Sequence, residues 1–328
     1  GIGVFGYIQT TGSGPGETIV LKVGNRTFGE SYVERRLRYE INNAVPGQPI
    51  LLNEQVAVVQ TLNAIEGEEL NRQGAPDLGI SVSNDEIDAE IRKNLRLTDS
   101  SDQNAFAAAY RQAVLDSGLT VNDYREVIAA TLLEDKIRQH IRDGITDTAE
   151  QIKMRDIRVA AQADAQTVLS RLAAGEDFAT VAANVSTDIA TKNNGGDMDW
   201  TPLSALSTNV ANAVLPLSVG QLSAPVQSSG SYTIYQVMDR QPNMPVTSDQ
   251  RTQIENQSYL NWEGQVAQQV TTQPYYISDM TIYNNLVAVA KQDGAGQPTP
   301  TPASASTPAS TPPASTPAST PGPTSGQP

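Results

Sequence analysis

Cysteine is absent from the 328-residue chain, and histidine occurs only once, at His140. The absence of cysteine excludes disulfide bonds and zinc sites built from thiolates. A single histidine also excludes the imidazole clusters that commonly hold metal ions. His140 lies in a helical pattern next to arginine and glutamine, so we expect a solvated side chain without a catalytic role. The sequence therefore predicts no metal centre.

Basic residues are also scarce. The chain has 22 lysine and arginine residues against 36 aspartate and glutamate residues, which gives a formal net charge of −14. Nucleic-acid binding depends on a basic surface that releases counterions from the phosphate backbone. The composition therefore predicts that no nucleic acid is a partner of this protein.

The chain has no long apolar run, although it begins with a short one. The first residues, GIGVFGYI, are too few to span a bilayer, and a linker rich in glycine and threonine follows them. We expect residues 1–17 to be the end of a signal peptide or membrane anchor with its linker, so that an anchor precedes them in the full-length protein. The alternative is a first β-strand.

The other end of the chain has almost no large apolar side chains. Residues 291–328 contain variations on TPAS and hold ten of the chain's 20 prolines. Such a segment cannot bury a core, which predicts a disordered tail with polyproline character. This composition is typical of a cell-wall spacer or a glycosylated stalk, and a featureless tail is an equal alternative.

Helical periodicity dominates residues 18–150. The region opens with TIVLKVGNRTF, where β-branched residues flank a Gly-Asn pair, which predicts a small hairpin. Ser83 and Glu86 then form a capping-box pattern ahead of a helix. The apolar residues with helical spacing are Val33, Leu37 and Ile41; Val56, Val59, Leu62 and Ile65; and Ile87, Ile91 and Leu95.

The pattern changes after residue 150. Residues 151–241 alternate short strands with short helices, which predicts a compact α+β unit. Residues 242–290 return to a helical pattern, with Thr247 or Ser248 as the expected N-cap. The apolar residues expected to need partners in this helix are Ile254, Leu260 and Trp262.

A tight glycine turn, GGDMDW at residues 195–200, lies in the middle of the α+β unit. Two successive glycines allow positive φ and the close approach of another segment. LAAGEDFATVAANVSTD precedes this turn, and LPLSVGQLSAPVQSSGSYTIYQV follows it. In this order and spacing the motifs resemble parvulin-type peptidyl-prolyl isomerases, over roughly residues 153–240. The combination is far more specific than any one of its motifs.

The flanking helices are similar to those of SurA-like and PrsA-like extracytoplasmic foldases. In these proteins an N-terminal helical chaperone domain and a C-terminal helix pack together around a protruding parvulin domain. The implied fold class is α+β, with a small antiparallel sheet and its surrounding helices inserted in a mainly helical body. The implied domains are 18–150, helical; 151–241, parvulin-type; 242–290, a C-terminal helical segment that packs on the first domain; and 291–328, the tail.

The implied reaction is rotation about an X-Pro amide, which has a barrier of about 20 kcal/mol and breaks no bond. Each tenfold acceleration needs about 1.4 kcal/mol of preferential binding to the twisted amide. An apolar pocket for the proline ring and a few polar groups near the carbonyl can supply this preference. No cofactor is expected.

The resemblance also implies the residues of the site. The apolar pocket for the proline ring falls on Met198, Leu206 and Val210, and the polar position filled by cysteine or aspartate falls on Asp188. The two histidines that face each other across the family's site fall on Asp156 and Thr233. Both imidazoles are therefore missing.

The glycine turn departs from the family pattern as well. Asp199 stands where a glycine is usual, and Ser231 replaces a glycine before Tyr232. The turn is therefore either part of a working site or retained only for folding. Either role requires the backbone geometry that the paired glycines supply.

Three functions are consistent with this reading. The first is an extracytoplasmic peptidyl-prolyl isomerase and foldase, in which Asp156, Asp188 and Thr233 preserve a hydrogen-bond network. The second is a chaperone that binds unfolded or proline-containing polypeptides without accelerating their isomerisation. The third is a structural protein of the cell envelope. We favour the first, which predicts a location outside the cytoplasm, in the cell envelope or secreted.

Overall fold

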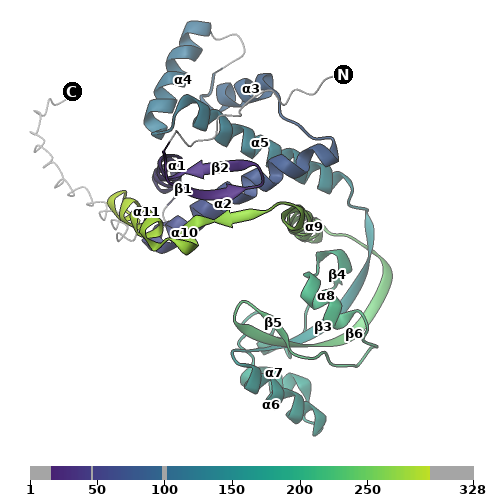
Figure 1. Ribbon diagram of the computed structural model, residues 1–328. Helices are drawn as coiled ribbons and strands as arrows, with labels where there is room; N and C mark the ends of the chain where they lie inside the picture. The colour runs from purple at the N-terminus through teal and green to yellow at the C-terminus, as the bar shows by residue number, and fades with distance from the viewer. Residues whose placement is uncertain (1–15, 46, 98–101, 296–328) are drawn as a thin grey trace, which may run out of the picture.

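The computed structural model describes residues 16–45, 47–97 and 102–295, and Figure 1 shows how their elements are arranged. A helical body occupies one end of the molecule. A smaller unit made of residues 148–245, here called the central unit, extends from it on two long strands. No helix in these described ranges is long and apolar enough to cross a membrane.

The core of the body joins both ends of the described chain. Strands β1 (Ile19–Val23) and β2 (Arg26–Gly29) form the expected hairpin, and β7 (Thr272–Pro274) pairs with β1 on its other side. Helices α1 (Glu30–Asn43), α2 (Glu54–Gly74) and α11 (Met280–Gln292) contribute most of the remaining buried side chains of this core. The short elements of the region are η1 (Pro49–Leu51), η2 (Ala75–Leu78) and α10 (Tyr275–Ser278).

Helices α3 (Asn84–Asn94), α4 (Gln103–Ser117) and α5 (Val121–Asp143) form a lobe with an apolar cluster of their own. Ion pairs connect α5 to the hairpin and to α1, because Glu126 contacts Arg26 and Asp123 contacts Arg35. The C-terminal half of α5 packs against α9 (Ser248–Gln269). A charged seam and an apolar contact therefore hold the lobe to the body.

Two long antiparallel strands form the centre of the central unit. Strand β3 (Thr148–Val159) pairs with β6 (Ser231–Pro245), and β4 (Thr201–Pro202) and β5 (Val226–Ser228) complete the order β4-β3-β6-β5. Helices α6 (Gln162–Ala173) and α7 (Phe178–Val185) cover one face. The 3-10 helix η4 (Leu203–Ala205) and α8 (Thr208–Val214) contribute to the cluster on the other face.

The architecture confirms the α+β fold class, with an antiparallel sheet and its helices inserted in a mainly helical body. The capping box of Ser83 and Glu86 is present, and Thr247 is the N-cap of α9. Two core assignments are wrong, because Val59 and Leu260 are exposed, whereas Val58 and Tyr259 are buried. Helical periodicity identified the buried face of each helix only to within one residue, so that it selected the exposed neighbour of the buried residue.

The predicted anchor and most of the predicted tail lie outside the described residues, since residues 1–15 and 296–328 are not among them. Strands β3 and β6 extend a few residues beyond the expected limits of 151 and 241. The two strands thereby lead directly into α5 and α9 of the body.

Candidate functional site

The candidate site lies on the face of the central sheet opposite α6 and α7. In the β3–β6 ladder Asp156 is paired with Tyr235, and Arg158 is paired with Thr233. Paired residues and residues two apart on a strand share a face, so these four side chains lie on one side of the sheet. Ile157 and Ile234 point to the other side, where they pack against the helices.

The glycine turn is fastened to this sheet at Asp156. The 3-10 helix η3 (Lys192–Asn194) leads into Gly195 and Gly196, whose φ angles are +67° and +80°. The Asp156 amide donates to the Gly196 carbonyl at 2.8 Å, and a Cβ on Gly196 would lie 2.4 Å from the Asp156 carbonyl oxygen. Only glycine fits here, because the turn approaches β3 more closely than any side chain allows.

The turn also places Met198 on the apolar side of the site. The Met198 amide donates to the Met154 carbonyl at 2.9 Å. Met198 and Val210 pack partly buried against a cluster that contains the buried Leu206, so the structure brings the three predicted pocket residues together. Ser207 caps α8 and thereby fixes the helix that carries Val210. The rest of this cluster consists of Ile152, Met154, Val214, Val226, Tyr235 and Val237.

The polar side of the site is more deeply buried. Asp156 is 2% exposed and Thr233 is 3% exposed. The Thr191 hydroxyl donates to Asp156 Oδ1 at 2.6 Å. Burial raises the pKa of Asp156, because a low-dielectric environment disfavours the charged carboxylate, and the nearby charge of Asp188 raises it further. The Thr191 hydrogen bond only partly offsets this effect.

Asp188 is held beside the strand by the motif Ser-Thr-Asp. The Ser186 hydroxyl accepts hydrogen bonds from the amides of Arg158 and Asp188, both at 3.2 Å. The Asp188 carboxylate forms an ion pair with the Arg158 guanidinium at 2.8 Å and also accepts from the Ala190 amide at 3.0 Å. The predicted residue Asp188 is therefore next to the site and already paired with a cation.

Sequence reasoning missed Tyr235, Arg158 and Thr191. Tyr235 is 9% exposed and belongs to the apolar cluster, while its hydroxyl interacts with Thr233. Burial raises the pKa of Tyr235, and the charge of Asp156 adds to this effect. Tyr235 and Arg158 follow Thr233 and Asp156 by two positions, so strand alternation was the available signal. Thr191 lies in a loop, where no periodicity marks it.

His140 is exposed on α5, as expected, and lies outside the sheet that carries the candidate site. It borders a cavity of about 500 Å³ at the junction of α5, α9 and η4, beside Ile141 and Ile254. Within the described ranges, no group of three or more histidine, cysteine, aspartate or glutamate side chains is placed to hold a metal ion.

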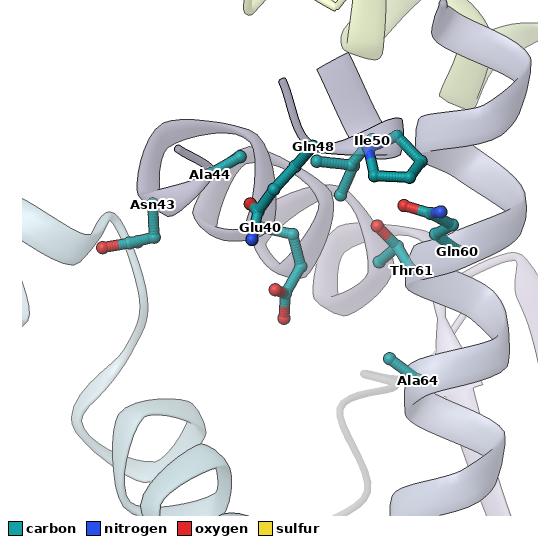
Figure 2. A pocket seen from close by; sticks show the side chains of 9 residues that line it. Glu40, Asn43, Ala44, Gln48, Ile50, Gln60, Thr61 and Ala64 are labelled. Carbon is teal, nitrogen blue, oxygen red and sulfur yellow. The ribbon is translucent and has the colours of Figure 1, made fainter. Parts of the chain in front are cut away.

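A second cavity, of about 390 Å³, lies in the helical body between α1, η1 and α2, and Figure 2 shows its lining. Glu40, Gln48 and Gln60 supply polar groups around it, and Ile50 supplies an apolar one. The Thr61 hydroxyl is buried at 1% exposure and makes no hydrogen bond within the described part of the chain. The lining of this cavity therefore mixes polar and apolar side chains.

Two family models match the chain in succession. The model of the SurA-like N-terminal domain matches residues 2–138, and that of the PPIC-type PPIase domain, called Rotamase, matches residues 140–239. The second match contains every residue of the candidate site. It also contains the glycine turn that fastens the site to β3.

Three relatives illustrate the likeness. Foldase protein PrsA of Caldanaerobacter subterraneus subsp. tengcongensis is 27% identical over 53% of this chain and 54% of its own length. Foldase protein PrsA of Geobacillus kaustophilus is 27% identical over 56% of this chain and 71% of its own. Chaperone SurA of Xylella fastidiosa (strain Temecula1) is 34% identical over 35% of this chain and 24% of its own.

The chain spans about half the length of the first of these relatives. Among solved structures, a peptidylprolyl isomerase (PrsA) from Bacillus anthracis is 21% identical, with a TM-score of 0.40 over 70% of this chain and 95% of that one. The two successive family matches cover the N-terminal part of the helical body and most of the central unit, and they end before α9, β7, α10 and α11. The chain therefore contains a SurA-like N-terminal domain followed by a PPIC-type peptidyl-prolyl isomerase domain.

Proposed function

We propose that this protein is a peptidyl-prolyl cis–trans isomerase that assists the folding of exported polypeptides. The observation that carries the proposal is the sheet face on which Met198, Leu206 and Val210 meet beside the polar residues Asp156 and Thr233. An apolar pocket next to a polar edge is what binding of a proline ring and its amide requires. The reaction breaks no bond, so no nucleophile is needed.

In the proposed mechanism the apolar residues bind the proline ring and exclude water from it. Asp188 is the more accessible carboxylate on the polar side, so it is the group that a bound amide reaches first. Asp156 and Thr233 are more deeply buried, and together with Thr191 they hold that edge of the site in place. The twisted amide loses its resonance and interacts more strongly with polar groups than the planar amide does, which lowers the barrier.

Exchange NMR on an Ala-Pro peptide tests the proposal in the whole chain without a coupling protease. Leu206→Ala should weaken peptide binding by roughly tenfold, because it removes apolar contact made in the ground state as well as in the twisted state. Asp188→Asn should lower the isomerisation rate and leave the affinity unchanged. Leu215→Ala, an exposed leucine of the same unit, is the matched control. Unchanged binding in a folded Leu206→Ala protein would overturn the pocket assignment.

A second function, chaperoning without turnover, is supported by a specific observation. Asp156 and Thr233 are almost inaccessible, and Asp188 already pairs with Arg158 at 2.8 Å. Polar groups that are engaged within the protein are less available to the twisted amide. This alternative predicts that the protein binds the Ala-Pro peptide but leaves its exchange rate at the uncatalysed value.

The proposed clients are unfolded or proline-containing polypeptides, and the proposed location is outside the cytoplasm, with a membrane anchor ahead of the first residue. The Pro/Ser/Thr-rich composition of the C-terminal residues supports this location. Accessibility of the full-length protein to an added protease on intact cells tests it. Protection of the protein until the cells are lysed would contradict the proposal.

A further inference from the structure

We propose that Gln250, which belongs to the helical body, is a positioning residue for the apolar pocket of the central unit. Helix α9 thereby determines how well that pocket binds a proline ring. The inference rests on the proposed function of the site, but it concerns a residue outside the stretch that carries the parvulin motifs. If Gln250 has this role, a residue of the helical body helps to shape the pocket of the central unit.

The Gln250 side chain makes four hydrogen bonds. Its Nε2 donates to Gln151 Oε1 at 2.8 Å and to the Trp200 carbonyl at 2.7 Å. Its Oε1 accepts from the Thr247 amide at 3.1 Å and from Gln151 Nε2 at 3.3 Å. A side-chain amide has two donor hydrogens and two acceptor lone pairs, so all of this capacity is used. The side chain is therefore held in one orientation.

The partners of Gln250 belong to the central unit. Gln151 is completely buried in β3, between Pro202 of β4 and Gln241 of β6, and its Nε2 also donates to the Pro245 carbonyl at 3.0 Å. A buried amide of this kind needs partners, because leaving it unpaired costs free energy. Gln250 supplies two of its hydrogen bonds. The first turn of α9 is therefore hydrogen-bonded to the end of the sheet nearest the body.

The Trp200 carbonyl connects this contact to the pocket. Trp200 follows Met198 by two positions, and the chain then passes through β4 and η4 to Leu206. Helix α9 also packs directly against η4. Both ends of the segment 198–206, which carries two of the three pocket residues, are therefore held by α9. Two further anchors attach this segment to β3, namely the hydrogen bond from Met198 to Met154 and the pairing of β4 with β3.

The polar side of the site is held differently. Asp156 is fixed by the glycine turn and by Thr191, and Asp188 is fixed by Ser186 and Arg158. None of these contacts involves α9. Loss of the Gln250 amide should therefore loosen the pocket wall without moving the polar groups. The expected signature is weaker binding with an unchanged rate once the peptide is bound.

The test uses Gln250→Ala in the full chain, with Gln257→Ala as the matched control on the same helix. The Gln257 Nε2 donates only to Asn261 of α9 in the described contacts, at 2.9 Å. Both variants carry Trp262→Phe, so that Trp200 is the only remaining tryptophan of the chain. We expect Gln250→Ala to raise the Kd for an Ala-Pro peptide roughly tenfold, to leave kcat unchanged and to shift Trp200 emission to longer wavelength. Gln257→Ala should match the Trp262→Phe protein without a further substitution in all three measurements.

Gln250→Glu separates the positioning role from helix capping. The carboxylate still accepts from the Thr247 amide, but it cannot donate to the Trp200 carbonyl or to Gln151. This variant should reproduce the weaker binding and the emission shift even if Gln250→Ala fails to fold. Unchanged Trp200 emission and unchanged affinity in a folded variant would overturn the inference. If the parent binds no proline peptide, the proposed function fails, and Trp200 emission alone decides whether Gln250 holds the segment.

Discussion

In the helical body, residues from both ends of the described chain share one core, whereas the central unit is formed by the single stretch 148–245 (Figure 1). Strand β7 completes the sheet of β1 and β2, and α11 packs against α1 and α2. The core of the body is therefore complete only when β7 and α11, which follow the central unit in sequence, pack against β1, α1 and α2. The central unit has both of its apolar clusters within its own sequence.

The two regions also treat buried charge differently. In the body, Arg36 is almost completely buried but pairs with Glu68 and Glu40, both within 2.8 Å. In the central unit, Asp156 is equally buried, yet its carboxylate accepts a hydrogen bond from the neutral Thr191. A buried charge is tolerated when it is paired and is costly when it is not. The body thus buries charge within stabilising pairs, and the central unit buries it beside the candidate site.

The largest effect should come from removing residues 272–295, which supply β7, α10 and α11. Leu286 and Ala290 are fully buried in the core of the body, so the truncated body should lose its cooperative unfolding transition. The central unit should keep its dispersed amide resonances in NMR spectra. A chain that ends at Gly296 is the control and should unfold like the parent. A truncated protein whose body still melts cooperatively would contradict the shared core.

Gly196→Ala should destabilise the central unit alone, by about 3 kcal/mol. The new Cβ would meet the Asp156 carbonyl oxygen at 2.4 Å, in a backbone conformation with φ +80°. Gly220→Ala is the control, because its φ is +89° but nothing lies within 4 Å of the added atom, and it should cost about 1 kcal/mol. Chemical denaturation followed by NMR distinguishes the two regions. Equal losses from the two substitutions would show that the turn is not closely packed.

Asp156→Asn should stabilise the central unit at neutral pH, by less than Gly196→Ala destabilises it. Burial raises the folded-state pKa of Asp156 above its unfolded value, so ionisation disfavours folding as the pH rises through the folded pKa. Asparagine still accepts from the Thr191 hydroxyl and carries no charge. The gain in melting temperature should be present at pH 7 and should disappear at a pH below the unfolded-state pKa. A less stable variant at pH 7 would show that the carboxylate is needed.

Glu86→Gln in the body should have the smallest effect, below about 1 kcal/mol, because the Glu86–Lys136 pair is exposed. The hydrogen bonds from Lys136 and from the Ser83 amide lower the pKa of Glu86 to about 2. This stabilisation is present above the unfolded-state pKa and is lost as the pH falls towards 2. Thermal melts at low and high salt should show that added salt shrinks the difference at pH 7. An effect that resists salt would mean that the pair is better shielded than its exposure indicates.

The grouping of Met198, Leu206 and Val210 in one cluster was predictable because the parvulin motifs fix these residues in sequence order, and their role as a proline pocket stays a prediction. Two core positions, Val59 and Leu260, were misassigned because helical periodicity identifies an apolar stripe only to within a neighbouring position. Strand alternation places Tyr235 on the same face as Thr233, but the pattern alone does not show that it is buried, because a tyrosine in a strand is also an ordinary surface residue. The position of Gln250 three residues after Thr247 indicates only a helix cap. Its contacts with Gln151 and Trp200 could not be predicted, because these residues are distant in sequence.

The sequence by itself determined the elements and their order, because helix caps, alternation and paired glycines act over a few residues. Ser83 with Glu86 and Gly195 with Gly196 show this, since each pair specifies a local geometry that the structure contains. Only the tertiary structure decided which charges are neutralised and which segments hold the pocket. Arg158 meets Asp188 across 30 residues, and Gln250 meets Trp200 across 50. Contacts of this range depend on how strands and helices pack, and no local pattern encodes them.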